Sequence, residues 1–124
     1  MLSPADREAI ERLVWAVDNA ATRRDDAAYA ALYAEDGVMQ GSKGNVQGRD
    51  AIRAAVKAVW AGEPARSQHL TRELMIDEEA GEIVAHSKLV IVVPGGATPF
   101  AQASVIQTIR RTDEGWRISR RFVK

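Results

Sequence analysis

The second half of the chain carries four strand-like segments that are joined by three short turn sequences. Glycine, proline and acidic residues fill the joints, and joints of this kind favour hairpins between consecutive strands. The segments have apolar side chains on both faces, as Leu89 and Val90 illustrate. We therefore expect one face of the sheet to pack against helices and the other to meet a second subunit. The predicted strands cover residues 67–76, 82–93, 101–112 and 116–123.

Three helices are predicted ahead of these strands. Ser3 is a typical N-cap and Pro4 a typical first helical residue, and apolar residues at three-and-four spacing extend this helix to about Arg24. Helices followed by an antiparallel meander indicate an α+β fold, with the helices on one face of a curved sheet. The other predicted elements are a helix at 27–33, a brief strand at 38–40, a glycine-rich loop at 41–48 and a helix at 49–60.

Composition limits the classes of protein to which the chain can belong. Its 124 residues suffice for one domain, which we assign to residues 1–124. The 17 basic and 17 acidic side chains cancel, so binding of nucleic acid or of an anionic membrane is not expected. No segment approaches the length of a membrane span and the N-terminus lacks a leader pattern, so a cytoplasmic protein is expected.

Several kinds of chemistry have no support in the sequence. The chain has no cysteine, which excludes disulfides, thiolate metal ligands and cysteine nucleophiles. It has no glycine-rich dinucleotide motif and no phosphate loop, so no cofactor is expected. Its two histidines, His69 and His86, lack helical histidine–glutamate spacing, so we expect no metal site. Catalysis would have to use oxygen and imidazole groups.

Four short motifs occur in a fixed order along the chain. They are a helix and turn at 29–38, a Gly-Arg-Asp-Ala-Ile helix start at 48–52, a strand led by His69, and a final hairpin at 112–118. In this order they resemble the SnoaL-like group of polyketide cyclases in the nuclear-transport-factor-2-like superfamily. The resemblance implies a cone-shaped fold whose helices and concave sheet enclose a pocket, usually in a homodimer. Members include cyclases, dehydratases, isomerases, epoxide hydrolases and non-catalytic binding domains.

The resemblance places His69 at the family's strand histidine, which commonly faces the pocket. An imidazole there can exchange a proton with a group next to a carbonyl, or it can simply pack in the core. Thr22 occupies the position of an aspartate in many relatives, and Asp18 lies one helical turn earlier. Two interpretations of Asp18 remain open. Either burial raises its pKa and it acts with His69, or it is solvated and paired with Arg12 or Arg23.

Other side chains are candidates for lining the pocket. Large amphipathic rings suit sites for apolar ligands, although core packing explains them equally well. Gln102 and Gln107 lie on opposite faces of their predicted strand, and whichever faces inward can orient a carbonyl oxygen. Arg120 alternates with apolar residues and is predicted to face inward, whereas Arg121 is predicted to be solvated. The remaining candidates are Trp15, Thr22, Tyr29, Tyr33, Met39 and Trp60.

Two functions of different classes are compatible with these residues. The first is a cofactor-independent cyclase, isomerase, dehydratase or hydrolase that acts on an apolar oxygenated metabolite such as a polyketide or terpenoid. His69 would be its acid or base, with Asp18 assisting if it faces inward. The second is a binding protein with the same pocket and no turnover, which fits the presence of Thr22 in place of the acid. A dimerisation module is a further alternative.

Overall fold

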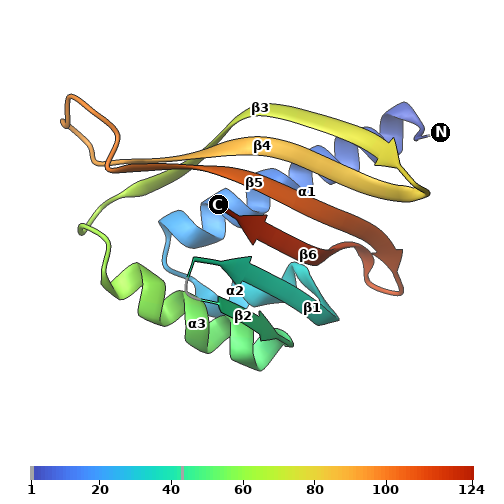
Figure 1. Cartoon of the computed structure of the whole chain (residues 1–124), viewed down its shortest axis with the longest axis horizontal. Helices are drawn as coiled ribbons and strands as arrows, with labels where there is room; N and C mark the ends of the chain where they lie inside the picture. Colours follow the sequence, from blue (N-terminus) through green and yellow to red (C-terminus); the bar gives the residue numbers. More distant parts are fainter. Residues whose placement is uncertain (1, 43) are drawn as a thin grey trace.

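Six strands form one curved sheet and three helices cover its concave face in the computed structural model, which describes residues 2–42 and 44–124 (Figure 1). The strands lie in the order β2-β1-β6-β5-β4-β3, and neighbours are antiparallel except for β1 and β6, which are parallel. The predicted α+β class is confirmed. The elements are α1 (Pro4–Thr22), α2 (Asp26–Ala31), β1 (Tyr33–Gly41), β2 (Gly44–Gln47), α3 (Arg49–Ala61), β3 (Gln68–Glu79), β4 (Glu82–Val92), β5 (Ala101–Thr112) and β6 (Gly115–Val123).

Helix α1 begins where the sequence predicts it. The Ser3 hydroxyl accepts a hydrogen bond from the Asp6 N–H at 3.0 Å, and Pro4 occupies the first turn. The Arg7 guanidinium donates to the Ile76 carbonyl of β3 at 3.0 Å and so attaches the helix to the sheet. Neither α1 nor any other helix in the described ranges is long and apolar enough to cross a membrane. The apolar side chains that α1 buries are Ile10, Leu13, Val14, Val17, Ala20 and Ala21.

The segment after α1 differs from its prediction. Helix α2 ends at Ala31, because Tyr33 pairs with Ile118 as the first residue of β1. The Ile118 N–H donates to the Leu32 carbonyl at 2.9 Å, so pairing with β6 replaces the last predicted helical turn. Strand β1 then continues to Gly41 and pairs with β2, where the sequence predicts a loop. Lys43, within that predicted loop, lies outside the described residues.

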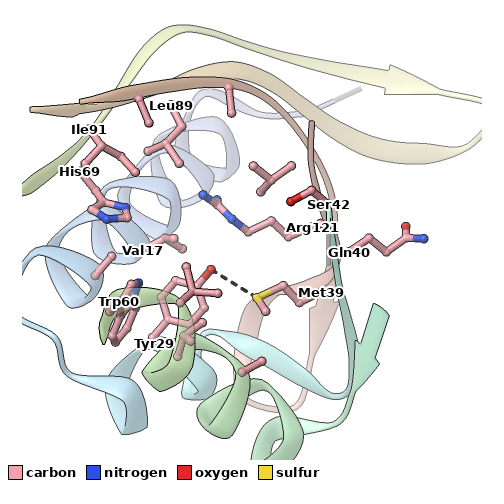
Figure 2. A pocket seen from close by; sticks show the side chains of 18 of the residues that line it. Val17, Tyr29, Met39, Gln40, Ser42, Trp60, His69, Leu89, Ile91 and Arg121 are labelled. Atoms are coloured by element: carbon pink, nitrogen blue, oxygen red, sulfur yellow. Dashed lines mark hydrogen bonds between the residues drawn. The ribbon is translucent and has the colours of Figure 1, made fainter. Parts of the chain in front are cut away.

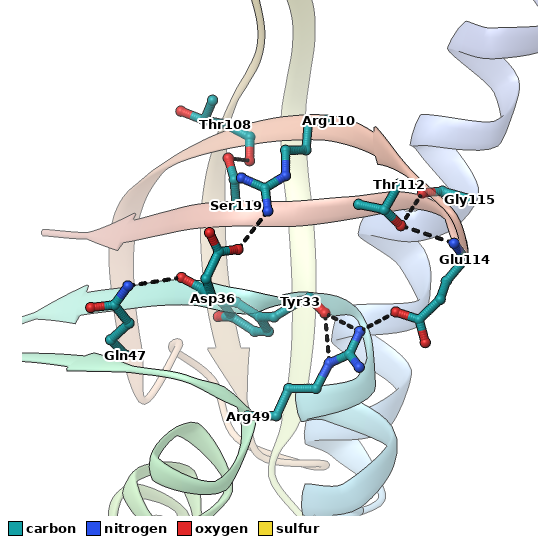
Figure 3. Close-up of polar contacts among 10 residues, drawn as sticks. All are labelled: Tyr33, Asp36, Gln47, Arg49, Thr108, Arg110, Thr112, Glu114, Gly115 and Ser119. Atoms are coloured by element: carbon teal, nitrogen blue, oxygen red, sulfur yellow. Dashed lines mark hydrogen bonds and ion pairs between the residues drawn. The ribbon is translucent and has the colours of Figure 1, made fainter.

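Arg49, the arginine of the predicted helix-start motif, fastens the start of α3 to the sheet. Its guanidinium donates two hydrogen bonds to the Tyr33 carbonyl, at 2.9 and 2.7 Å (Figure 3). It also pairs with Glu114, in the turn between β5 and β6, at 2.6 Å. One side chain therefore connects α3, β1 and the final hairpin, which explains the motif as a structural one.

A β-bulge in β6 interrupts its pairing with β5. Ile118 pairs with Ile109 and Arg120 pairs with Thr108, so Ser119 has no register partner on β5. The Ser119 hydroxyl donates instead to the Thr108 carbonyl at 3.0 Å (Figure 3). An extra residue of this kind moves every later side chain of its strand to the opposite face.

The bulge overturns the prediction for two neighbouring arginines. Arg120, predicted to face inward, is exposed, and its guanidinium donates to the Gln40 side chain at 2.6 Å. Arg121, predicted to be solvated, is only 5% exposed and lies under the concave face. Simple alternation from Ile118 fails because it does not allow for the extra residue, Ser119.

The outer face of the sheet carries no helix in the described ranges (Figure 1). His86 and Lys88 alternate along β4 and both lie on this face, and His86 Nε2 is 2.7 Å from Oε2 of Glu79. With Asp77, these two residues bring three metal-ligating atoms within 4.8 Å of one another. That group is largely exposed and shares no residue with the cavity described below.

Candidate functional site

A cavity of about 540 Å³ lies between the three helices and the concave face of the sheet (Figure 2). Its exposed lining residues, such as Val59 at 43%, mark where it opens to solvent. A cavity of this size accommodates a small organic molecule. Four mostly enclosed acidic or basic side chains reach a mainly apolar surface, namely Asp18, Glu63, His69 and Arg121. The apolar walls include Val17, Val56, Trp60, Leu89, Ile91 and Val123.

His69 is held by a buried carboxylate. Its Nε2 lies 2.8 Å from Oε1 of Glu63, and the two side chains are only 8% and 6% exposed. Strand β3 presents His69 to the cavity, because its register partner Ile91 lies on the same face and also lines the cavity. The backbone N–H of His69 donates to the Thr22 hydroxyl at 2.9 Å, which ties this strand to the end of α1.

Glu63 is itself positioned by two donors to the same oxygen. The Ser67 hydroxyl donates to Oε1 at 3.2 Å, and Nη2 of Arg24 lies 3.4 Å from it. Arg24 also donates to the Ser67 hydroxyl at 2.5 Å. Its backbone has a φ of 58°, in the left-handed region that few side chains adopt, and this ends α1. The carboxylate is thereby directed at the imidazole ring.

This arrangement defines the roles of the two ring nitrogens of His69. A carboxylate only accepts hydrogen bonds, so Nε2 carries the proton that faces Glu63. Within residues 2–42 and 44–124, Nδ1 has no hydrogen-bond partner and is not among the fully enclosed polar atoms. In the neutral ring Nδ1 therefore holds the lone pair and is open to the cavity, where it can accept a proton from a ligand.

Asp18 is enclosed and lines the cavity from α1. It is 5% exposed, and its Oδ2 has no hydrogen-bond partner among the described residues. Burial raises the pKa of Asp18 above its ordinary value of 3.8, although hydrogen bonding from Thr71 and the charge of Arg121 oppose part of this shift. The position fits the inward-facing interpretation, but the His69 ring bonds Glu63 and not Asp18.

The raised pKa of Asp18 makes its contribution to stability depend on pH. A carboxyl whose folded-state pKa exceeds its unfolded value stabilises the fold while it is protonated, and this contribution is lost as the pH rises through the folded-state pKa. Asp18→Asn, which is neutral at every pH, is expected to match the wild type at or below pH 3.8 and to become the more stable protein toward neutral pH. The gain arises because the wild type must ionise a buried carboxyl at neutral pH, whereas the asparagine stays uncharged.

Urea unfolding of both proteins over a pH series measures this difference. Asp113→Asn is the matched control, because Asp113 is exposed and its replacement should leave the pH dependence unchanged. A difference between Asp18→Asn and the wild type that stays constant from acid to neutral pH would contradict the argument.

Arg121 enters the cavity from β6 as a buried cation (Figure 2). Its Nη1 donates to Oε1 of Gln107, its register partner on β5, at 2.9 Å. Gln107 is 0% exposed, so the face of β5 that carries it is the concave one. The sequence left open whether Gln102 or Gln107 faces inward, and the structure shows that it is Gln107.

Tyr29 and Trp60 form the helical wall of the cavity. Their rings meet edge to face with centroids 5.3 Å apart, and the Tyr29 hydroxyl donates to Sδ of Met39 at 3.9 Å (Figure 2). Tyr33 lies behind Tyr29, is 0% exposed, and does not line the cavity. The two tyrosine hydroxyls are 3.2 Å apart. Burial raises the pKa of Tyr33 well above its ordinary value, so its hydroxyl stays protonated and supports Tyr29.

Besides Tyr33, four predicted site residues lie outside the cavity or only at its rim. Trp15 is 52% exposed, because it lies beside the buried stripe of α1 and not on it. Thr22 is occupied by the His69 backbone, and Arg120 is turned outward by the bulge. Gln102 touches only the rim, since its register partner Val90 places its side chain on the outer face.

Two residues of the site were not predicted from the sequence. Glu63 lies in the turn between α3 and β3. The only sequence feature that points to its role is that it is an acidic residue six positions ahead of His69. The sequence predicts that Arg121 is solvated. The one feature that could have indicated its inward position is the serine before the arginine pair, which forms the bulge. Both positions depend on contacts between segments that sequence spacing alone does not reveal.

Helices packed on a concave sheet, with a cavity between the two layers, define the nuclear-transport-factor-2-like class of proteins. The family model of the SnoaL-like domain matches residues 3–122. The chain therefore belongs to the SnoaL-like domain family, and the resemblance inferred from the four motifs is confirmed. No curated protein sequence matches the chain significantly.

Solved structures similar to this chain share its fold. A Nostoc punctiforme protein of unknown function with a cystatin-like fold is 22% identical, with a TM-score of 0.89 over 98% of this chain and 92% of that one. An NTF2-like protein of Novosphingobium aromaticivorans is 27% identical, with a TM-score of 0.80 over 96% and 80%. ActVI-ORFA of Streptomyces coelicolor is 18% identical, with a TM-score of 0.75 over 93% and 92%.

Proposed function

We propose that the protein is a cofactor-independent acid–base enzyme of the cyclase, isomerase or dehydratase type that acts on a small oxygenated molecule. The observation that carries this proposal is the buried hydrogen bond of 2.8 Å between His69 and Glu63. A homodimer formed through the outer sheet face, a cytoplasmic location and a single domain over residues 1–124 are parts of the same proposal.

These reaction types share one kind of first step. Each can begin with removal of a proton from a carbon next to a carbonyl, which requires a base within reach of the substrate. His69 Nδ1 is open to the cavity, and Glu63 holds the ring and stabilises the imidazolium that proton transfer creates. Asp18 and the Tyr29 hydroxyl are further polar groups available to a substrate oxygen.

A binding protein without turnover is the second candidate. It is favoured by one observation: within the described ranges, neither Asp18 nor a tyrosine hydroxyl hydrogen-bonds to the His69 ring. A second acid–base group is therefore not assembled around the imidazole before a ligand binds. Binding without proton exchange would support this candidate.

Proton exchange in heavy water distinguishes the two. A panel of enolisable cyclic and aromatic ketones is incubated with the protein in D₂O, and deuterium incorporation next to the carbonyl is followed by NMR and mass spectrometry. Wild type is expected to accelerate exchange in at least one ketone, and His69→Gln to lose that acceleration. His86→Gln is the matched control, because His86 is also paired with a glutamate but lies on the outer face, and it is expected to retain the activity.

Each outcome of this experiment favours one of the two candidate functions. Exchange that persists in His69→Gln would overturn the assigned base, and a ketone that binds but never exchanges would identify a binding protein. Circular dichroism and thermal unfolding of each variant show whether a loss of exchange reflects a loss of fold.

A further inference from the structure

Arg121 is a buried cation without an anionic partner. It is 5% exposed, and its one hydrogen bond among the described residues goes to the neutral amide of Gln107. No carboxylate within those residues forms an ion pair with it, whereas Glu63, another buried charge of the cavity, pairs with His69 and Arg24. A guanidinium has five N–H donors, so Arg121 retains several that are unused.

The unused donors of Arg121 face the cavity. Its remaining nitrogens are not among the fully enclosed polar atoms of the described chain, so they are accessible from the cavity that the residue lines. Figure 2 shows the guanidinium entering the same space as His69 from the sheet side, opposite Tyr29. Gln107 fixes the group from behind through Nη1. The side chain is thus oriented toward whatever occupies the cavity.

A buried guanidinium in apolar surroundings favours an anionic ligand. Burying a charge without a counter-charge is unfavourable, and arginine remains protonated under all ordinary conditions. Burial opposes the charge of Arg121, but Tyr29, Tyr33 and Asp18 together raise its pKa, so the cation persists. Carboxylates match the guanidinium fork with two parallel hydrogen bonds.

We propose that Arg121 anchors the carboxylate of an apolar carboxylic acid, so that the cavity takes acids in preference to their neutral analogues. The apolar body of such an acid would lie against walls that include Trp60, Leu89 and Ile91. This inference deepens the proposed function by naming the substrate class, and it depends on that function only in taking the cavity as the ligand site.

Asp18 modulates this site without pairing with Arg121. Its carboxyl lines the same cavity and its charge favours the Arg121 cation, yet no hydrogen bond or ion pair joins them within the described residues. An ionised Asp18 would repel an incoming carboxylate. Removing its charge should therefore strengthen the binding of an acid, which is opposite to the effect of removing Arg121.

The test compares 2-naphthoate with neutral 2-naphthamide, which have the same ring system. Isothermal titration calorimetry of the wild type is expected to show tighter binding of the acid. Arg121→Met should weaken acid binding about 10- to 100-fold, the value of one or two charge-assisted hydrogen bonds, and weaken amide binding by a much smaller factor, because the amide carries no charge. Asp18→Asn should tighten acid binding. Arg120→Met is the matched control, because Arg120 faces outward, and it should behave as the wild type.

Retained binding of the amide shows that Arg121→Met is folded, and Arg121→Lys tests whether charge without the planar fork suffices. The proposal is wrong if the wild type binds the amide as tightly as the acid, if it binds neither, or if Arg121→Met keeps the preference for the acid. The outcome is independent of turnover. A preference that depends on Arg121 in a protein without proton exchange would leave this inference standing and remove only the proposed enzymatic function.

Discussion

Glu63→Gln is expected to slow proton exchange at the cavity about 100-fold or more while leaving the fold intact. The glutamate carboxylate accepts a hydrogen bond from His69 Nε2 at 2.8 Å and so leaves the lone pair on Nδ1. A glutamine amide can turn its NH₂ group toward the ring and donate to Nε2, which would move the imidazole proton to Nδ1. The nitrogen that faces the cavity would then be a donor and could no longer act as the base.

The deuterium-exchange rate constant of Glu63→Gln, measured with a ketone that the wild type processes, checks this prediction. Glu79→Gln is a matched control, since Glu79 pairs with His86 at 2.7 Å on the outer face, where both side chains are at least 41% exposed. Its rate is expected to equal that of the wild type. An unchanged rate in Glu63→Gln would show that the carboxylate is not needed to direct the His69 ring.

Ile118→Ala is expected to lower the free energy of unfolding by about 2–5 kcal/mol. Ile118 is 0% exposed at the centre of the main core, in register with Tyr33 on β1 and Ile109 on β5. Removing three carbon atoms there leaves a void. Strand β6 cannot move to close it, because β6 is hydrogen-bonded to β1 on one side and to β5 on the other. Domains of this size are stable by about 5–15 kcal/mol, so the loss is a large fraction of the total.

Denaturant unfolding followed by tryptophan fluorescence measures the change. Met75→Ala provides the comparison, because Met75 is 61% exposed on the outer part of β3, and its free energy of unfolding should change by less than about 1 kcal/mol. Since Ile118 does not line the cavity, ligand affinity of the folded variant should stay unchanged. A loss below about 1 kcal/mol would mean that the core around β6 relaxes to fill the void.

The parts of the fold that follow from local sequence were predictable. The Ser3–Pro4 start and the apolar spacing of α1 are local properties, and so are the turns that join the last four strands. The course of the chain from α2 to β2 was not, because Tyr33 gains a partner in Ile118, which is 85 positions away in the sequence. Helical propensity cannot anticipate a strand that pairs with the opposite end of the chain.

The residues of the candidate site also fall into those that the sequence predicts and those that it does not. Inward positions of His69, Tyr29, Met39 and Trp60 agree with the motifs and the spacing from which they were inferred. The sequence indicates Asp18 on α1 as the partner of the imidazole, but the carboxylate that bonds the ring comes from Glu63 in a turn. A turn has no periodicity, so the direction of its side chains is set by tertiary contacts, here with Arg24 and Ser67, which sequence spacing does not encode.

The single extra residue at Ser119 also determines how this strand must be compared with the last strand of other family members. A relative without the bulge reaches the position equivalent to Arg121 one residue sooner after its counterpart of Ile118. A gapless alignment of the two strands would place Arg121 beside an outward-facing neighbour, and the residue in that column would say nothing about the relative's cavity. The inward position is defined by its partner Gln107, and counting from that partner identifies which relatives carry a charge at the same place.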